Sequence, residues 1–291
     1  MKETIRENTF ENATGKIDYT LMNDYMFHRV MQESSRARAG LVSSLLHIRH
    51  EDIHSVIVTN PIEHGKFIDA KTCILDLKIL LNSTIIINIE LQVEAQSYWD
   101  DRSVTYLARI VDDLKKGDNY VELKPTYHIG ILNFTLFPDY PEFYATNKMI
   151  NIKKHYVYND KFTLNVLDLN QINLATDEDR LWKLDDWARL FKAKTWEELK
   201  MLAQKDDVFE ETCETIFELN QDDIARYWAE AREEGLRIAR TNEKLHKDEI
   251  ARKDRALAEK DNEIAENKKI LAEKDAQIAL LMYQLKEKSN I

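Results

Sequence analysis

The 291-residue chain contains only two cysteines, Cys73 and Cys213, which stand far apart in the sequence. Closely spaced cysteine pairs are typical of zinc sites, and a dense set of cysteines is typical of disulfide-stabilised secreted domains. Neither pattern occurs here. The low cysteine content therefore indicates a reducing compartment, and we expect a cytoplasmic protein.

Long apolar runs are missing as well. Polar residues interrupt even the densest stretch, ILDLKILLNSTIIINIELQ (residues 74–92), and the N-terminus MKETIRENTFENATGK has no apolar signal region. A helix needs about 20 apolar residues to cross a bilayer. We therefore expect no transmembrane segment and no membrane partner.

The sequence also has no excess of basic residues. Its formal net charge is −11, and residues 222–291 hold 15 basic and 16 acidic residues, which leaves a net charge of −10 on residues 1–221. Strong binding to phosphate backbones without sequence preference needs a basic surface. The composition argues against such a surface over the whole molecule but leaves room for a local basic groove.

Apolar spacing in the first two thirds of the chain predicts helices mixed with strands. Asn23 is a good N-cap for a helix whose apolar stripe includes Met26 and Val30, and residues 40–50 continue as a second helical segment. A helix over 98–117, with Gly117 as its C-cap, carries Val104 and Leu107 on one apolar face. The predicted strands cover 53–61, both arms of a hairpin around Asn82-Ser83, 127–137 and 161–171, with a weaker strand at 154–159. This order predicts a mixed α+β (α/β) fold with a central sheet flanked by helices.

The C-terminal third is predicted to be helical. Trp182, Trp187 and Trp196 lie on a helix pair that breaks near Thr195, a pattern typical of helices packed on a core rather than of an aromatic ligand platform. We divide the chain into a loose arm (1–18), a core (19–180), a helical subdomain packed on the core (181–221) and a long charged helix (222–291).

The long charged helix contains a heptad repeat. One large apolar residue recurs every seven positions, at Ile250, Leu257, Ile264, Leu271, Ile278 and Leu285. A strong coiled coil has two such positions per heptad. The narrow seam therefore predicts either a coiled coil with a second copy or another helical partner, or a solvated single helix.

The hairpin around Asn82-Ser83 carries the chemistry. Alternation places Asp76 and Lys78 on one face of the first strand, and Glu90 and Gln92 on one face of the second. A turn at Asn82-Ser83 makes Asp76 and Glu90 cross-strand neighbours. Two buried carboxylates repel each other and are costly to desolvate, whereas Mg²⁺ binds such oxygens and can activate water. The pair is therefore either a metal site or two acids that pair with lysine or arginine at a sheet edge.

The pattern NDYMF…ILDLK…INIELQ…DRSVTYLARIVDDLKKGDNYVELKPTYHIGILNF, over residues 18–140, resembles the PD-(D/E)XK nuclease superfamily. It is most similar to the transposase-like branch, the recombination-promoting nucleases. The resemblance implies a restriction-endonuclease-like core with a central mixed sheet. It also implies DNA as the partner and Mg²⁺ (or Mn²⁺)-dependent endonuclease activity in DNA mobility, recombination or defence. The alternative is a catalytically weak or inactive nuclease-fold protein that acts through DNA binding or through its C-terminal helix.

By this resemblance, Asp76 and Glu90 are metal ligands, and Gln92 stands where the superfamily usually has a lysine that positions or activates the attacking water. Glutamine can orient a water but carries no charge. Lys78 shares a face with Asp76, so it either supplies the missing charge or is a solvated strand lysine.

Three further residues have two interpretations each. Asp24 is either a third metal-binding acid or a stabiliser of its helix N-terminus. Arg102 and Tyr106, four residues apart on one helix, either line the site and contact a DNA phosphate or pack the helix on the sheet with a surface ion pair.

Overall fold

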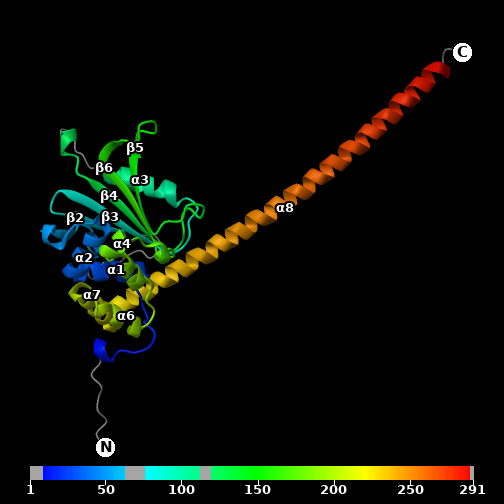
Figure 1. Ribbon diagram of the computed structural model, residues 1–291. Coiled ribbons are helices and arrows are strands. Elements are labelled where there is room, and N and C mark those ends of the chain that lie inside the picture. The colour runs from blue at the N-terminus through cyan, green and yellow to red at the C-terminus, as the bar shows by residue number, and fades with distance from the viewer. Residues whose placement is uncertain (1–8, 63–75, 112–118, 289–291) are drawn as a thin grey trace, which may run out of the picture. The chain divides into compact units, whose positions relative to one another are not determined.

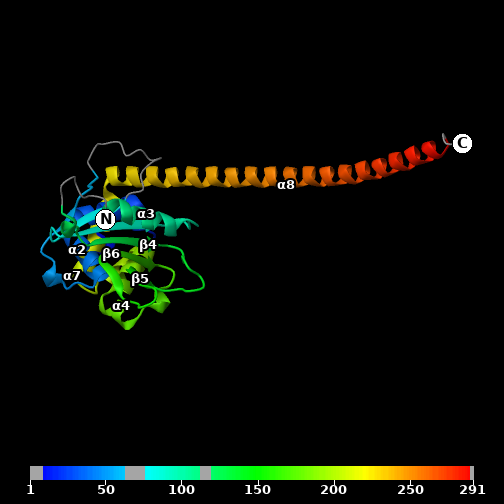
Figure 2. The ribbon, with the colours of Figure 1, turned by 90° about the horizontal axis from the view of Figure 1, so that it is seen from above.

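The computed structural model describes residues 9–62, 76–111 and 119–288. Its contacts divide the chain into two units, Met1–Glu233 and Glu234–Ile291. The first unit holds a six-stranded mixed sheet with helices on both faces (Figures 1 and 2). This confirms the predicted mixed α+β fold.

The strands are β1 (Val56–Val58), β2 (Leu77–Leu81), β3 (Ile85–Gln92), β4 (Thr126–Leu132), β5 (Tyr144–Ile150) and β6 (Val157–Asp168). The α-helices are α1 (Asp24–Glu33), α2 (Ser35–Leu46), α3 (Trp99–Val111), α4 (Asp177–Leu181), α5 (Leu184–Lys192), α6 (Trp196–Ala203), α7 (Asp207–Gln221) and α8 (Asp223–Lys288). Short 3-10 turns lie at Phe10–Asn12, His50–Asp52, Tyr120–Glu122 and Ile172–Leu174.

The strand order is β1-β2-β3-β4-β6-β5. The central strands β3, β4 and β6 are parallel, whereas β1, β2 and β5 run antiparallel to their neighbours. Helix α3 forms the connection from β3 to β4, as a parallel pair requires. The centre of the sheet is therefore buried, and its two edges are antiparallel.

The β2–β3 hairpin turns at the predicted residues. Asn82 and Ser83 both have positive φ, 48° and 61°, and Leu81 pairs with Ile85, so the connection is a three-residue loop, Asn82–Thr84. This turn pairs Leu77 with Ile89. The next position outward places Asp76 opposite Glu90, so the predicted cross-strand relationship is confirmed.

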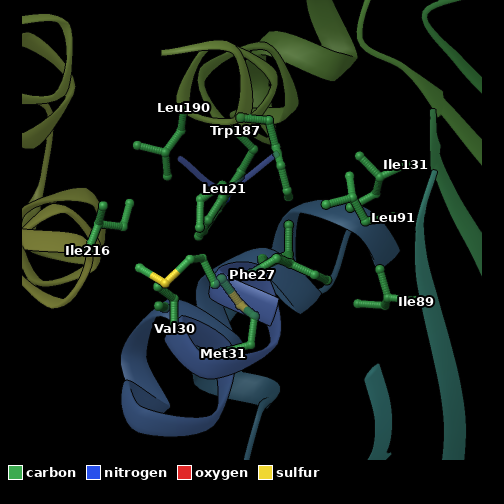
Figure 3. Packing of buried hydrophobic residues seen from close by; sticks show 14 of the residues in the cluster. Leu21, Phe27, Val30, Met31, Ile89, Leu91, Ile131, Trp187, Leu190 and Ile216 are labelled. Atoms are coloured by element: carbon green, nitrogen blue, oxygen red, sulfur yellow. The ribbon is translucent and has the colours of Figure 1, made fainter. Parts of the chain in front are cut away.

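The main core lies on the sheet face that carries Ile89 and Leu91. Helix α1 packs its predicted stripe against this face, with Phe27 and Val30 fully buried, and α5 and α7 close the same cluster (Figure 3). The Asn23 side chain accepts a hydrogen bond from the Met26 amide at 3.2 Å, which confirms the N-cap. The apolar spacing thus fixed both the start of α1 and its buried face.

Helix α3 covers the opposite face of the sheet, and it does so with a different stripe from the predicted one. Trp99 and Ser103 are buried, whereas Val104 is 60% exposed. Arg102 and Tyr106 lie on the packed side of α3, beside the buried acids of the sheet. The expected C-cap Gly117 lies outside the described residues.

Two further expectations about local structure changed. Strand β5 was not anticipated, because its outer residues are exposed at the sheet edge and show no alternation. Strand β6 is one 12-residue strand that merges two predicted segments. The described part of the N-terminal arm is docked rather than loose, since Ile17 is buried and the Phe10 ring meets Trp196 edge-on at 6.4 Å.

The helical region after β6 contributes to the core. Trp187 and Trp196 are buried, and Thr195 caps α6 by accepting a hydrogen bond from the Glu198 amide, so the helix pair breaks where predicted. No helix in the described ranges is long and apolar enough to span a membrane.

Helix α8 is 66 residues long. Its first turns belong to the first unit, because Ala225 and Ala229 are fully buried there. Further along, the heptad residues are exposed, with Leu257 at 61% and Leu271 at 60%.

Candidate active site

Asp76 and Glu90 lie side by side on the sheet face covered by α3. Asp76 directly precedes β2 and Glu90 lies in the second half of β3, and both side chains are buried. Glu90 is also level with Gly130 of β4, a neighbour without a side chain. The two acids therefore lie between the sheet and α3.

Burial controls the ionisation of this pair. Desolvation raises the pKa of Asp76 to about 6, although a hydrogen bond from Asn88 and the charges of Arg102 and Lys78 oppose the rise. Desolvation, and then repulsion from Asp76, raise the pKa of Glu90 to about 7, against the attraction of Arg102. Both carboxyls thus titrate near neutral pH without a cation.

Three of the four carboxylate oxygens, Asp76 Oδ1, Glu90 Oε1 and Glu90 Oε2, have no well-aligned hydrogen-bond donor among the described residues, although Glu90 Oε1 forms an ion pair with Arg102. Buried oxygens without donors are costly, and a hard divalent cation satisfies them. Within the described ranges no group of three or more His, Cys, Asp or Glu side chains is arranged to hold a metal. The donor set therefore fits a divalent cation that the two carboxylates would hold.

Arg102 of α3 meets this pair from above. Its Nη2 lies 3.0 Å from Glu90 Oε1 in an ion pair and donates a hydrogen bond to the Tyr106 hydroxyl at 3.2 Å. The guanidinium also lies 5.0 Å from the Tyr106 ring centre. The structure thus brings Arg102 to the predicted site, with Tyr106 beside it. Contact of either residue with DNA stays a prediction.

Sequence reasoning missed two residues of the site, Asn88 and His128, which are both fully buried. Asn88 Nδ2 lies 3.5 Å from Asp76 Oδ2 and 3.1 Å from His128 Nδ1. Burial lowers the pKa of His128 to about 4, so its ring is neutral at pH 7. An amide nitrogen only donates, so Nδ1 accepts and the ring proton lies on Nε2, 3.8 Å from Glu90 Oε2.

Asn88 thus links Asp76 to His128 through hydrogen bonds, and His128 lies close to Glu90. The available signal was a polar residue inside each of two apolar strands, with Asn88 two positions before Glu90 and therefore on the same face.

Trp99 and Gly130 form the floor of the arrangement. A methyl group on Gly130 would lie 2.2 Å from Trp99 Cζ2, so only glycine lets the indole pack directly over β4. Trp99 also stacks on His128, with ring centres 6.2 Å apart. The close approach of α3 to the sheet, which brings Arg102 to Glu90, depends on this contact.

Gln92 and Lys78 lie at the margins of the pair. The Gln92 amide donates to the Glu94 carbonyl oxygen at 3.1 Å, in an exposed hydrogen bond. Lys78 is exposed and pairs across the hairpin with Asn88 rather than with Glu90. Catalytic roles for both residues stay predictions.

Asp24 is held elsewhere. Both of its carboxylate oxygens accept hydrogen bonds from Arg232 of α8, each at 2.8 Å from Nε. Helix α1 packs on the face of the sheet opposite α3. No contact in the described residues joins Asp24 to Asp76 or Glu90. A metal-binding role for Asp24 stays a prediction that requires Arg232 to release it.

Comparison with protein families matches residues 21–244 to the model described as PD-(D/E)XK nuclease family transposase, and this range includes the whole sheet and the start of α8. Comparisons with curated proteins and with solved structures found no match.

Proposed function

The chain belongs to the PD-(D/E)XK nuclease family of transposases, and on that premise we propose that it is a Mg²⁺-dependent DNA endonuclease that hydrolyses phosphodiester bonds beside Asp76 and Glu90. The observation that carries this proposal is the pair of adjacent buried carboxylates, three of whose oxygens accept no well-aligned hydrogen bond from the described residues. The cysteine usage is consistent with action in the cytoplasm.

Asp76 and Glu90 are the residues that would hold the cation, which when bound polarises a phosphate oxygen and lowers the pKa of a water. Asn88 donates to one oxygen of Asp76 and leaves the other free to bind. The Nε2 proton of the neutral His128 ring faces the Glu90 carboxylate, at 3.8 Å between Nε2 and Oε2. Tyr106 accepts a hydrogen bond from Arg102 and restricts that side chain to the space above Glu90.

Gln92 follows Glu90 on the same face of β3 and is the nearest candidate to orient the attacking water. It supplies no positive charge for the transition state. Lys78, whose charge lowers the pKa of Asp76, is the candidate for that part.

The second candidate function is a nuclease-fold protein that binds DNA or a partner helix with little or no cutting. Two observations favour it: the Gln92 amide is bonded to a backbone carbonyl, and Arg102 already neutralises Glu90.

Plasmid nicking with Mg²⁺ or Mn²⁺ separates these candidates. We expect the wild-type chain to nick and Asp76→Asn and Glu90→Gln to lose cutting, because an amide cannot replace a carboxylate ligand. The matched control is Asp186→Asn, which removes a buried acid of α5 that pairs with Lys205 outside the site, and this variant should cut normally. A wild type that never cuts, or site variants that cut as fast as wild type, would overturn the nuclease proposal.

A further inference from the structure

The β5–β6 hairpin differs in charge from the rest of the first unit. Residues 147–161, NKMINIKKHYVYNDK, contain four lysines and one acid, Asp160. Residues 1–221 as a whole carry a net charge of −10. The hairpin is therefore a local basic element on an acidic body, and it lies outside the Asp76–Glu90 site.

The hairpin extends past its neighbours in the sheet. Strand β6 starts at Val157, whereas its pairing with β4 begins only at Phe162 (Figure 1). The turn is well organised, since the Asn151 side chain accepts hydrogen bonds from the backbone amides of Lys153 at 3.1 Å and Lys154 at 2.9 Å. The tip thus presents two adjacent lysines from a defined turn.

The lysines of the hairpin are available to a ligand. Lys148, Lys153 and Lys154 are exposed, and none pairs with an acid in the described part of the chain. Lys161 is the exception, because its ammonium donates to the Val121 carbonyl at 3.1 Å.

Large apolar and aromatic side chains are exposed between these lysines. Ile152 is 84% exposed, Tyr158 72% and Tyr156 55%. A cluster of exposed apolar groups marks an interaction surface, and lysines interleaved with tyrosines suit a polyanion that also offers sugars and bases.

We propose that the β5–β6 hairpin is a DNA-binding element, with Lys148, Lys153 and Lys154 on backbone phosphates and Tyr156, Tyr158 and Ile152 packed against the sugars and bases. The choice of DNA as the polyanion rests on the proposed nuclease function. The acidic body repels DNA, so a substrate needs a local cationic contact to stay near the site.

The register of the sheet supports a contact on the same duplex. Glu90, Gly130 and Val166 lie in one row across β3, β4 and β6. Ala145 of β5 pairs with Val166 and Ile150 pairs with Val157, so register shifts in this pair fit nine residues of β6 opposite five residues of β5. At about 3.3 Å per residue, the end of the paired hairpin lies about 17 Å along β5 from this row. One turn of B-DNA is about 34 Å, so a duplex whose backbone reaches Glu90 offers phosphates to the hairpin within one turn.

Fluorescence anisotropy tests the hairpin proposal. The labelled duplex has about 30 base pairs, long enough for nearly three turns. The full chain carries Asp76→Asn, so that the DNA stays intact. The hairpin variant is Lys148→Glu/Lys153→Glu/Lys154→Glu. The control is Lys260→Glu/Lys268→Glu/Lys274→Glu, which makes the same charge change at exposed positions of α8.

We expect the hairpin variant to lose about tenfold or more in affinity and to show a shallower dependence of log K on log salt, by about 0.9 for each lost phosphate contact. The control should keep the wild-type salt slope. Tyr156→Ala/Tyr158→Ala should weaken binding without changing the slope, and unchanged thermal midpoints show that each variant is folded.

Several results would overturn the hairpin proposal. One is an unchanged affinity and salt slope in the hairpin variant, and another is binding of phosphatidylserine vesicles in place of DNA. A fall in sedimenting mass of the hairpin variant with DNA affinity unchanged would indicate contact with a second copy instead.

Parallel nicking assays keep the two proposals distinct. A wild type that nicks, with hairpin variants that bind normally, removes only the hairpin proposal. A wild type that binds through the hairpin and never nicks removes only the nuclease proposal.

Discussion

The Arg102 guanidinium lies 3.0 Å from a carboxylate oxygen of Glu90, and Glu90 is fully buried. This ion pair neutralises one of the two acids of the candidate site. A divalent cation bound by the same oxygens would compete with Arg102 for Glu90. The contact therefore links the stability of the metal-free protein to its affinity for metal.

Arg102→Ala should lower the stability of the metal-free protein by about 3 kcal/mol, because it leaves a buried carboxylate without its partner. Added Mg²⁺ or Mn²⁺ should raise the thermal midpoint of this variant more than that of wild type, because the Arg102 guanidinium no longer competes with the metal for Glu90. Thermal unfolding in EDTA and in metal measures both effects. Arg109→Ala, an exposed arginine on the same helix, is the control. An equal metal response in Arg102→Ala and wild type would contradict the competition.

The raised pKa values predict the sign of the pH dependence. The pKa is about 6 for Asp76 and about 7 for Glu90 in the folded protein, whereas unfolded carboxyls titrate near 4. Between these values the folded state binds more protons than the unfolded state. The pair's contribution to the free energy of unfolding is therefore full below about pH 4 and is lost as pH rises through about 7.

Glu90→Gln removes one titrating group, so in EDTA its thermal midpoint should rise relative to wild type between pH 5 and pH 8, a range that spans the pKa of about 7. Excess Mg²⁺ should reduce the difference, because the metal stabilises the ionised form of the wild type. Parallel pH profiles for the two proteins would show that Glu90 has an ordinary pKa.

The local parts of this fold could be predicted from the sequence. The Asn82-Ser83 turn sets the hairpin register, and one register places Asp76 opposite Glu90. The isoleucines of β3 and the stripe of α1 follow from periodicity alone. These relationships lie within short segments, where spacing fixes geometry.

Contacts between distant segments could not be predicted in this way. His128 reaches the site because β4 lies parallel to β3 at a register that no turn specifies. Arg232 reaches Asp24 from 208 positions along the chain. Only the packed structure identifies the support of Glu90 and the partner of Asp24.

Gln92→Lys should increase the nicking rate roughly tenfold or more, because a charged amine would stabilise the negative transition state. The hydrogen bond from the Gln92 side chain to the Glu94 carbonyl is exposed, so the change should cost less than about 0.5 kcal/mol in stability. Initial rates of plasmid nicking measure the effect. Lys78→Gln is the companion change, made both in the wild-type chain and in the Gln92→Lys variant. If Lys78 supplies the positive charge in the wild type, Lys78→Gln should slow nicking more in the wild-type chain than in the Gln92→Lys variant. A Gln92→Lys protein that cuts no faster than wild type would contradict this role for position 92.

Gly130→Ala should destabilise the protein by about 2 kcal/mol or more, because its methyl group would lie 2.2 Å from the ring of the fully buried Trp99. Relief of the clash moves α3 outward and weakens the Arg102–Glu90 pair. Urea unfolding measures the loss. Trp99→Phe provides space, so the double variant should be more stable than the sum of the single changes predicts. Strict additivity would show that the two residues do not clash.

Truncation of α8 must respect its packed first turns. A chain that ends at Glu233 keeps the buried Ala229 and the Arg232–Asp24 pair, and it should unfold at the same temperature as the full chain. We expect the full chain to sediment above its monomer mass of 34.3 kDa through the exposed heptad seam, and the truncated chain to sediment as a monomer. Leu257→Lys/Leu271→Lys in the full chain should also give a monomer, because it places charge in the seam without shortening the helix. A full chain that already sediments as a monomer would exclude the seam as a self-association surface and favour a solvated helix or a different helical partner.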